Sequence, residues 1–128
     1  MLELETTGLA TGGEAVGRDA EGRTVFVSGA LAQERVRVRV TEQKKRFARA
    51  ELIEVIDASP DRIVPRCPEV ANGCGGCDLA HASLDAQRQA KARMIVDAAT
   101  RIGRLATVPP VTITPLDVDG FRTTLRAG

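Results

Sequence analysis

The residues best suited to chemistry are three cysteines, Cys67, Cys74 and Cys77, which follow a C-x6-C-x2-C pattern. They are all the cysteines of the chain, and they fall within eleven consecutive positions. The two-residue gap between Cys74 and Cys77 lets neighbouring thiolates converge on one metal ion or cluster. Glycines at positions 73, 75 and 76 let the backbone wrap closely and leave its amide hydrogens available to sulfur. The spacing therefore predicts a metal or cluster site rather than a group of small buried thiols.

The single histidine of the chain leaves the kind of site open. His81 follows Cys77 after three intervening residues, and with the cysteines it makes a Cys3His set, a composition common in structural zinc sites. The other interpretation is a cluster on the cysteines, with His81 as a hydrogen-bonding residue beside the cluster or the next helix. A redox dithiol at Cys74 and Cys77 is disfavoured because the flanking sequence lacks a thioredoxin-like βαβ pattern.

The composition is that of one compact domain, or of a small domain with an appendage. The chain has 128 residues, a net charge of +1, three phenylalanines and no tryptophan or tyrosine. Its core must be aliphatic, which suits a small barrel. An odd number of cysteines cannot close a disulfide framework, so we expect a reducing, cytoplasmic environment. We expect no membrane association, because the sequence contains neither a signal-peptide pattern nor an apolar run of membrane-spanning length.

Side chains that alternate between apolar and polar before the cysteines predict five short strands. The expected strands cover residues 2–7, 15–18, 24–27, 35–40 and 47–56. Their tight connections favour a small Greek-key barrel of the oligonucleotide-binding kind, with an open antiparallel sheet as the alternative.

One helix is expected after the cysteines, over residues 84–102. Ser83 is a suitable N-cap and Gly103 a suitable stop. Four apolar side chains recur at helical spacing and are expected to bury one face of this helix. They are Met94, Ile95, Ala98 and Ile102. Further strands are expected over residues 111–113 and 121–126.

The fourth expected strand carries a line of arginines that alternate with valines, so that the two residue types face opposite sides. Seven cations and one acid, Glu42, lie between positions 35 and 49. This pattern favours a binding surface for a nucleic-acid phosphate backbone over a merely solvated barrel face. Phe47 lies within the basic stretch, either to stack on a base or to join the core. The candidate binding residues are Arg35, Arg37, Arg39, Lys44, Lys45, Arg46, Phe47 and Arg49.

Two stretches of the chain together resemble a known family. Residues 25–31 (VFVSGAL) and 34–36 (ERV) resemble a TRAM domain. Residues 59–68 (SPDRIVPRCP) and 74–81 (CGGCDLAH) resemble the iron–sulfur region of the tRNA/rRNA (uracil-5-)-methyltransferases. Further similar positions are Gln87, Lys91, residues 101–103 and residues 121–122. The resemblance covers nearly the whole chain.

The resemblance implies a mainly β fold with one helix, divided into three parts. Residues 1–58 are expected to form a five-stranded, OB-like TRAM barrel that binds RNA. Residues 59–82 are expected to form a cysteine-rich loop that binds the cluster. Residues 83–128 are expected to contain the helix and the beginning of a central α/β domain.

The resemblance also implies an S-adenosylmethionine-dependent enzyme that methylates C5 of a uridine in tRNA or rRNA, with no DNA as partner. In this family a cysteine adds to C6 of the base and a general base removes the C5 proton. A [4Fe–4S] cluster is held by four cysteines, three of which match Cys67, Cys74 and Cys77.

The fourth cluster ligand, the domain that binds S-adenosylmethionine and the catalytic residues lie beyond position 128 in the family. We therefore expect this chain to be the RNA- and cluster-binding portion of such an enzyme, unable to methylate by itself. The alternative is a stand-alone RNA-binding TRAM module with a structural zinc on the Cys3His set.

Overall fold

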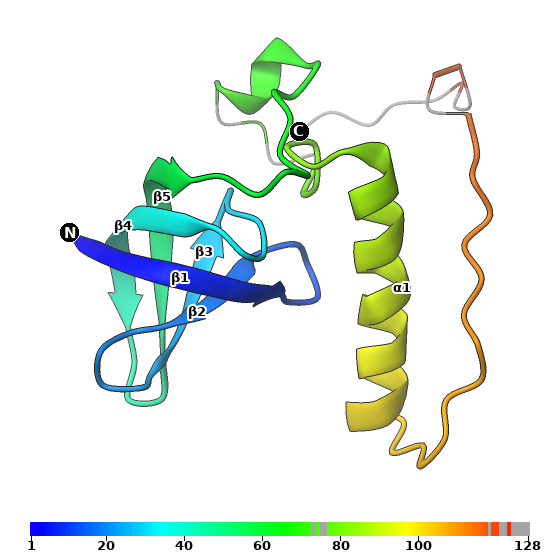
Figure 1. The fold of residues 1–128 in the computed structure, drawn as a ribbon, viewed down its shortest axis with the longest axis horizontal. Helices are drawn as coiled ribbons and strands as arrows, with labels where there is room; N and C mark the ends of the chain where they lie inside the picture. Colours follow the sequence, from blue (N-terminus) through cyan, green and yellow to red (C-terminus); the bar gives the residue numbers. More distant parts are fainter. Residues whose placement is uncertain (73, 75–76, 118, 121–122, 124–128) are drawn as a thin grey trace.

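The computed structural model describes residues 1–72, 74, 77–117, 119–120 and 123, which form a small barrel followed by a loop and a helix (Figure 1). The elements in chain order are β1 (Leu2–Leu9), β2 (Ala15–Arg18), β3 (Thr24–Ser28), β4 (Arg35–Gln43), β5 (Phe47–Asp57), η1 (Pro68–Val70) and α1 (Leu84–Arg101). The expected mainly β fold with one helix is confirmed. No helix within the described ranges is long and apolar enough to cross a membrane.

The five strands close into a barrel in the order β1-β2-β3-β5-β4, which excludes the open-sheet alternative. Strands β3 and β5 are parallel, and every other neighbouring pair is antiparallel. The barrel closes where β1 pairs with β4, with Leu4 opposite Val36. A closed barrel leaves no long unpaired strand edge.

The barrel core is aliphatic, as the composition predicts. Val25 and Val27 of β3 and Val36 and Val38 of β4 are fully buried. Their alternation with outward-facing residues confirms the period of two read from the sequence. Val40 departs from this pattern and is 40% exposed, because the β4–β5 ladder shifts register after it and continues as a hairpin.

The helix α1 begins where the sequence predicts, because the Ser83 hydroxyl accepts a hydrogen bond from the Ala86 N–H at 3.3 Å. It ends at Arg101, just before Gly103. The expectation that one face would be buried is wrong: no described residue of α1 is buried, and Ile95 is 50% exposed. The helix stands beside the barrel and is accompanied by the extended segment 104–117 (Figure 1), which is too narrow to cover an apolar face.

The strand expected over residues 111–113 does not form. These residues are extended without a β partner among the described residues, so they cannot make a ladder of backbone hydrogen bonds. Of the strand expected over residues 121–126, only position 123 is among the described residues, so this prediction lies outside what the structure describes.

Candidate functional site

The cysteines lie on a loop that leaves and rejoins the fold at one neck. Arg62 and Ala82 form an antiparallel bridge at this neck. On either side of it, the Ile63 N–H donates to the His81 carbonyl at 2.9 Å and the Ser83 N–H donates to the Asp61 carbonyl at 2.8 Å. The segment between Ile63 and His81 is therefore closed at its base, and all three cysteines lie within it.

An ion pair between a buried carboxylate and a partly buried guanidinium fixes this neck to the loop between β3 and β4. The Arg62 guanidinium donates to both oxygens of Glu34, from Nε at 2.6 Å and from Nη2 at 2.8 Å. The same Nη2 donates to the Gly29 carbonyl at 2.8 Å. The Glu34 carboxylate also accepts from the backbone N–H groups of Leu31 and Ser59. A carboxylate that is 1% exposed needs such partners, because an unpaired buried charge is very costly.

The same contacts set the charge of Glu34. Burial by itself would raise the pKa of this carboxyl, but the hydrogen bonds from Arg62 and the Leu31 N–H outweigh it and hold the pKa below its usual range. Glu34 is therefore ionised at neutral pH, and the pair with Arg62 is a bidentate one between two charges.

His81 makes a second link between the cysteine loop and the barrel. It is 8% exposed, and its Nε2 lies 3.2 Å from the Ala30 carbonyl. Because a carbonyl only accepts, this contact requires hydrogen on Nε2 and leaves Nδ1 as the free ring nitrogen when the ring is neutral. Burial lowers the pKa of His81, and the positive charge of Arg62 adds to the effect. His81 is thus neutral and hydrogen-bonded to the barrel, and its role beside a cluster or a zinc ion stays a prediction.

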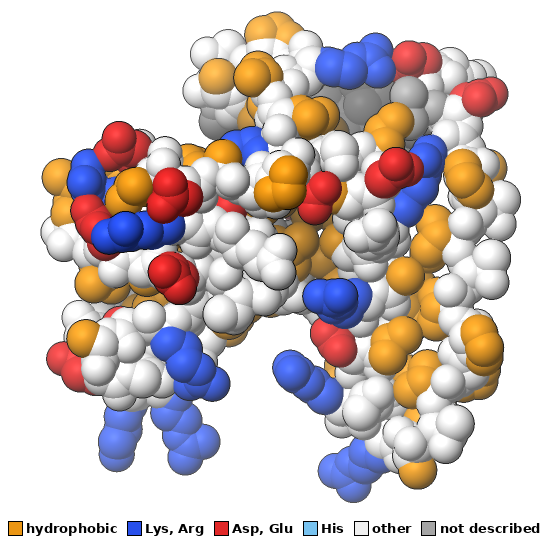
Figure 2. Space-filling view, viewed as in Figure 1, with side chains coloured by type: hydrophobic (Ala, Val, Ile, Leu, Met, Phe, Trp, Pro, Cys, Tyr) orange, Lys and Arg blue, Asp and Glu red, His pale blue; other side chains and the backbone are white. Residues whose placement is uncertain are grey.

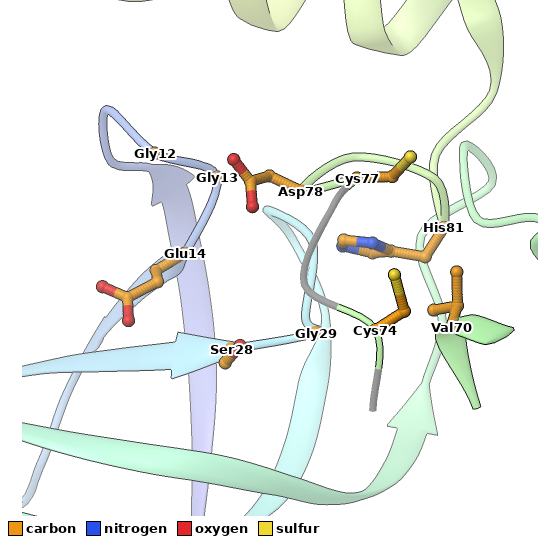
Figure 3. Close-up of a pocket in the computed structure, with 10 residues that line it drawn as sticks. All are labelled: Gly12, Gly13, Glu14, Ser28, Gly29, Val70, Cys74, Cys77, Asp78 and His81. Carbon is orange, nitrogen blue, oxygen red and sulfur yellow. The ribbon is translucent and has the colours of Figure 1, made fainter. Parts of the chain in front are cut away.

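Cys74 and Cys77 line one cavity of about 490 Å³ between the cysteine loop and the end of the barrel (Figure 3). His81 lies between the two cysteines in this view, and the β1–β2 loop forms the opposite wall. The wall is close because Gly13 has no side chain: a Cβ there would lie 2.9 Å from the Cβ of Asp78. The complete lining is Gly12, Gly13, Glu14, Ser28, Gly29, Val70, Cys74, Cys77, Asp78 and His81.

Cys67 lies on a neighbouring groove of about 1090 Å³, whose other wall is α1, and Cys77 borders this groove as well. All three thiols are free and exposed. As a donor set, three sulfurs on one loop suit an iron–sulfur cluster or a thiolate-rich zinc site. Within the described residues, however, no group of three His, Cys, Asp or Glu side chains is arranged to hold a metal ion.

The arginines of β4 lie on the outer face of the barrel, as predicted, but they are not alone there. Arg35 and Arg37 pair with Glu3 of β1, at 3.4 and 2.8 Å. Arg37 also pairs with Glu54 of β5. In the same way Arg39 pairs with Glu51 of β5. Figure 2 accordingly shows basic and acidic side chains intermixed over this part of the barrel. The face is therefore of mixed charge, not of the single sign that residues 35–49 suggest.

The cations at the β4–β5 hairpin differ from those of β4. Lys44 pairs with Glu42 at 3.1 Å. Lys45 and Arg46 are exposed, and neither has a carboxylate partner among the residues the structure describes. Figure 2 shows Lys and Arg side chains that protrude from this end of the barrel. Uncompensated charge is thus concentrated at the hairpin.

Phe47 lies on the outer face of the barrel and is half-buried, so it is not part of the core. Its ring meets that of Phe26 from β3, with centroids 6.0 Å apart at an angle of 72°. The Arg49 guanidinium lies 5.4 Å from the Phe26 centroid and 5.9 Å from that of Phe47. Phe26 is not among the binding residues expected from the sequence. Its position between Val25 and Val27, both buried, was the signal that it faces outward.

Residues 2–53, which span most of the barrel, match the family model of the TRAM domain. The barrel is therefore a TRAM domain.

The chain is also similar to proteins named as RNA methyltransferases. An uncharacterized RNA methyltransferase of Corynebacterium efficiens is 40% identical over 128 residues, which cover 99% of this chain and 30% of that protein. The 23S rRNA (uracil(1939)-C(5))-methyltransferase RlmD of Halomonas elongata is 48% identical over 101 residues, which cover 79% of this chain and 21% of that protein. The enzyme of the same name from Chromohalobacter salexigens is 42% identical over 120 residues, 94% of this chain and 25% of that protein.

These relatives confirm the resemblance to the tRNA/rRNA (uracil-5-)-methyltransferase family. The chain spans less than a third of the length of each of these relatives.

Proposed function

We propose that this chain is the RNA-binding and iron–sulfur-binding portion of an S-adenosylmethionine-dependent RNA (uracil-C5) methyltransferase. The observation that supports this proposal most strongly is that an RNA-binding type of barrel and a cysteine-rich loop are joined in one chain. A TRAM barrel is joined through the buried pair Glu34–Arg62 to a loop that carries three free thiols. Two of the relatives described above are named as enzymes of 23S rRNA, so ribosomal RNA is the first substrate to test.

In this proposal the barrel contacts the RNA backbone through its outward-facing cations. Lys45 and Arg46 are the strongest candidates, because no described carboxylate neutralises them. Arg35, Arg37 and Arg39 remain candidates, because exposed ion pairs contribute only about 1 kcal/mol or less and a phosphate can replace a carboxylate. A phosphate that binds a β4 arginine must first break an ion pair, which costs free energy. A phosphate that binds Lys45 or Arg46 does not have this cost.

The cysteine loop in this proposal holds a [4Fe–4S] cluster through Cys67, Cys74 and Cys77. The chain has no other cysteine, so a fourth protein thiolate would have to come from outside these 128 residues. When bound, the cluster supplies a covalent cross-link between three points of the loop. The buried neck at Arg62 and His81 would then hold that cross-linked loop against the barrel.

The experiment that tests RNA binding is the salt dependence of affinity for a fragment of 23S rRNA. The plot of log K against log salt has a negative slope, and each lost phosphate contact makes it shallower by roughly 0.7 to 0.9. We expect the double variant Lys45→Ala/Arg46→Ala to lose about 1.4 to 1.8 of this slope. The matched double variant Arg37→Ala/Arg39→Ala removes the same charge from the paired face and should lose less. Wild-type affinity that does not change with salt would contradict the proposal.

A further inference from the structure

We propose that the outer face of β3 and β5 is a stacking site for an unpaired base of single-stranded RNA, formed by Phe26, Phe47 and Arg49. This inference rests on the proposed function for the identity of the ligand as RNA. It adds that the barrel recognises an unstacked nucleotide, and it names the side chains that do so. We refer to these three residues as the platform.

The platform is fixed by the strand pairing. In the parallel ladder between β3 and β5, Phe26 stands opposite Arg49, and Thr24 stands opposite Phe47. The residues that alternate with the platform on the two strands point inward and are buried. They are Val25, Val27, Ala48 and Ala50. The two rings therefore cannot turn into the core, and they lie on the outer surface of the barrel.

The guanidinium of Arg49 is held in place over the rings. Its Nη1 donates to both oxygens of Glu14 on the loop before β2, at 2.7 and 2.6 Å. A guanidinium that lies within about 6 Å of an aromatic centroid gains a cation–π attraction, and its flat face can also stack on a base. Two rings and one oriented guanidinium thus present π-faces together. The positive charge beside them comes from Lys45 and Arg46, which have no carboxylate partner among the described residues, and single-strand binders use this combination.

The aromatic side chains are not needed for the core, which makes their position informative. Among the described residues, the buried hydrophobic cluster consists of Leu, Val and Ala residues. Both described phenylalanines lie instead on the outside of neighbouring strands, in contact with each other. A half-buried aromatic pair beside cations suits a nucleotide, whose base stacks and whose phosphate carries negative charge.

Cations lie at the hairpin end of the platform, where they can contact the phosphates next to a base stacked on the platform. Lys45 and Arg46 directly precede Phe47 in the chain. Arg18 of β2 pairs with Thr24 of β3, the residue that faces Phe47. The Arg18 guanidinium donates to the Gly22 carbonyl at 2.8 Å and has no carboxylate partner among the described residues. Three cations at this end are thus available to phosphate.

The cysteine cavity lies at the opposite end of the platform. Ser28 follows Phe26 by two residues on the same face of β3, a step of about 7 Å, and it lines the cavity. Glu14, which holds Arg49, lines the cavity too. An RNA strand that runs from the β4–β5 hairpin across the platform would therefore arrive beside Cys74 and Cys77. This path connects the two functional parts of the chain.

The absence of tryptophan and tyrosine from the sequence permits a direct test. In separate variants, Phe26→Trp and Phe47→Trp each introduce the sole strong fluorophore of the 128-residue chain. An oligouridylate of about 12 nucleotides, within the range that one OB fold covers, should quench both tryptophans by stacking. An abasic oligomer of the same length has the same number of phosphates but no bases, and it should leave the fluorescence of both tryptophans unquenched. Ile53→Trp is the matched control on β5, at a side chain that is 45% exposed and outside the platform, and neither oligomer should quench it.

Affinity gives a second measurement with unmodified rings. The wild-type chain should bind the oligouridylate roughly tenfold more tightly than the abasic oligomer, and Phe26→Leu should remove most of that difference without changing the salt slope. Phe47→Leu provides the same test if Phe26→Leu does not fold. Equal wild-type affinity for both oligomers, or bright tryptophans with the oligouridylate bound, would overturn the stacking site and leave RNA binding intact. Binding of neither oligomer nor the rRNA fragment would overturn the proposed function itself.

Discussion

Glu34 is the residue on which the link between the barrel and the cysteine loop depends. Its carboxylate accepts hydrogen bonds from Leu31 of its own loop and from Ser59 and Arg62, which follow β5 in the chain. The sequence marks Glu34 only as part of the stretch 34–36 that resembles a TRAM domain. It does not reveal the ion pair, because the partners of Glu34 at the neck lie 25 to 28 positions away. A buried pair of this kind is a property of the folded chain and not of a local pattern.

The first prediction concerns the loss of this charge. Glu34→Gln should lower the free energy of unfolding by about 3 kcal/mol, because it leaves Arg62 facing a neutral group inside the fold. Glu51→Gln is the matched control, since Glu51 pairs with Arg39 on the exposed face, and it should cost about 1 kcal/mol or less. Urea unfolding of the 128-residue chain measures both. Equal costs for the two variants would show that the buried pair is no stronger than a surface one.

The same carboxylate predicts a dependence of stability on pH. The pKa of Glu34 is lower in the folded chain than its ordinary value of 4.5. Its contribution is therefore complete above that value and is lost as the pH falls through the lower, folded pKa. Glu34→Gln should be less sensitive to acid in this window than the wild-type chain. Parallel stability curves for the two proteins below pH 4.5 would contradict this assignment.

Cys74 provides the test of the metal site. If the three thiolates hold an iron–sulfur cluster, anaerobically purified protein should contain iron and absorb visible light, and Cys74→Ser should lose most of both. Ala71→Ser is the control, because it places the same side chain at an exposed position in the same loop. Stoichiometric iron in Cys74→Ser would contradict the ligand assignment. A colourless wild-type protein that contains zinc would instead support the Cys3His site.

At the scale of elements, the strands were predictable because their side chains alternate. β2 has the bounds that the sequence predicts, and the others differ only at their ends. The start of α1 was predictable from Ser83 for an equally local reason. The prediction that one face of α1 is buried was wrong. Apolar spacing shows which side of a helix is apolar, but it does not show whether another element covers that side.

Close contact between β1 and β2 gives a prediction at this scale. A Cβ at Gly17 would lie 2.5 Å from the Leu4 Cδ1 atom and 2.7 Å from the Glu5 carbonyl oxygen. Gly17→Ala should therefore push the two strands apart and cost about 1 to 3 kcal/mol in thermal or urea unfolding.

Gly8→Ala is the matched control on β1, because no atom lies within 4 Å of the added group and the backbone there is not left-handed. This substitution should leave stability unchanged or raise it slightly. A Gly17→Ala variant as stable as Gly8→Ala would mean that β1 and β2 can separate without cost.

At the scale of the whole molecule, the sequence predicted which residues are basic but not how they are compensated. The carboxylates that pair with the β4 arginines come from β1 and β5, outside residues 35–49. The platform of Phe26, Phe47 and Arg49 likewise depends on the parallel pairing of β3 with β5, which no local pattern specifies. The uncompensated charge and the half-buried outer rings therefore move the expected RNA contact from the outer face of β4 toward β3, β5 and the β4–β5 hairpin.

The most direct test of this account is where RNA lies on the chain. The measurement is photo-cross-linking of the 128-residue chain to an oligouridylate that carries 4-thiouridine, followed by mapping of the linked peptides. We predict cross-links in β3, in β5 and in the β4–β5 hairpin, with the signal in β3 and β5 reduced in Phe26→Leu. Cross-links confined to β1, β4 or α1 would contradict RNA binding on β3, β5 and the hairpin.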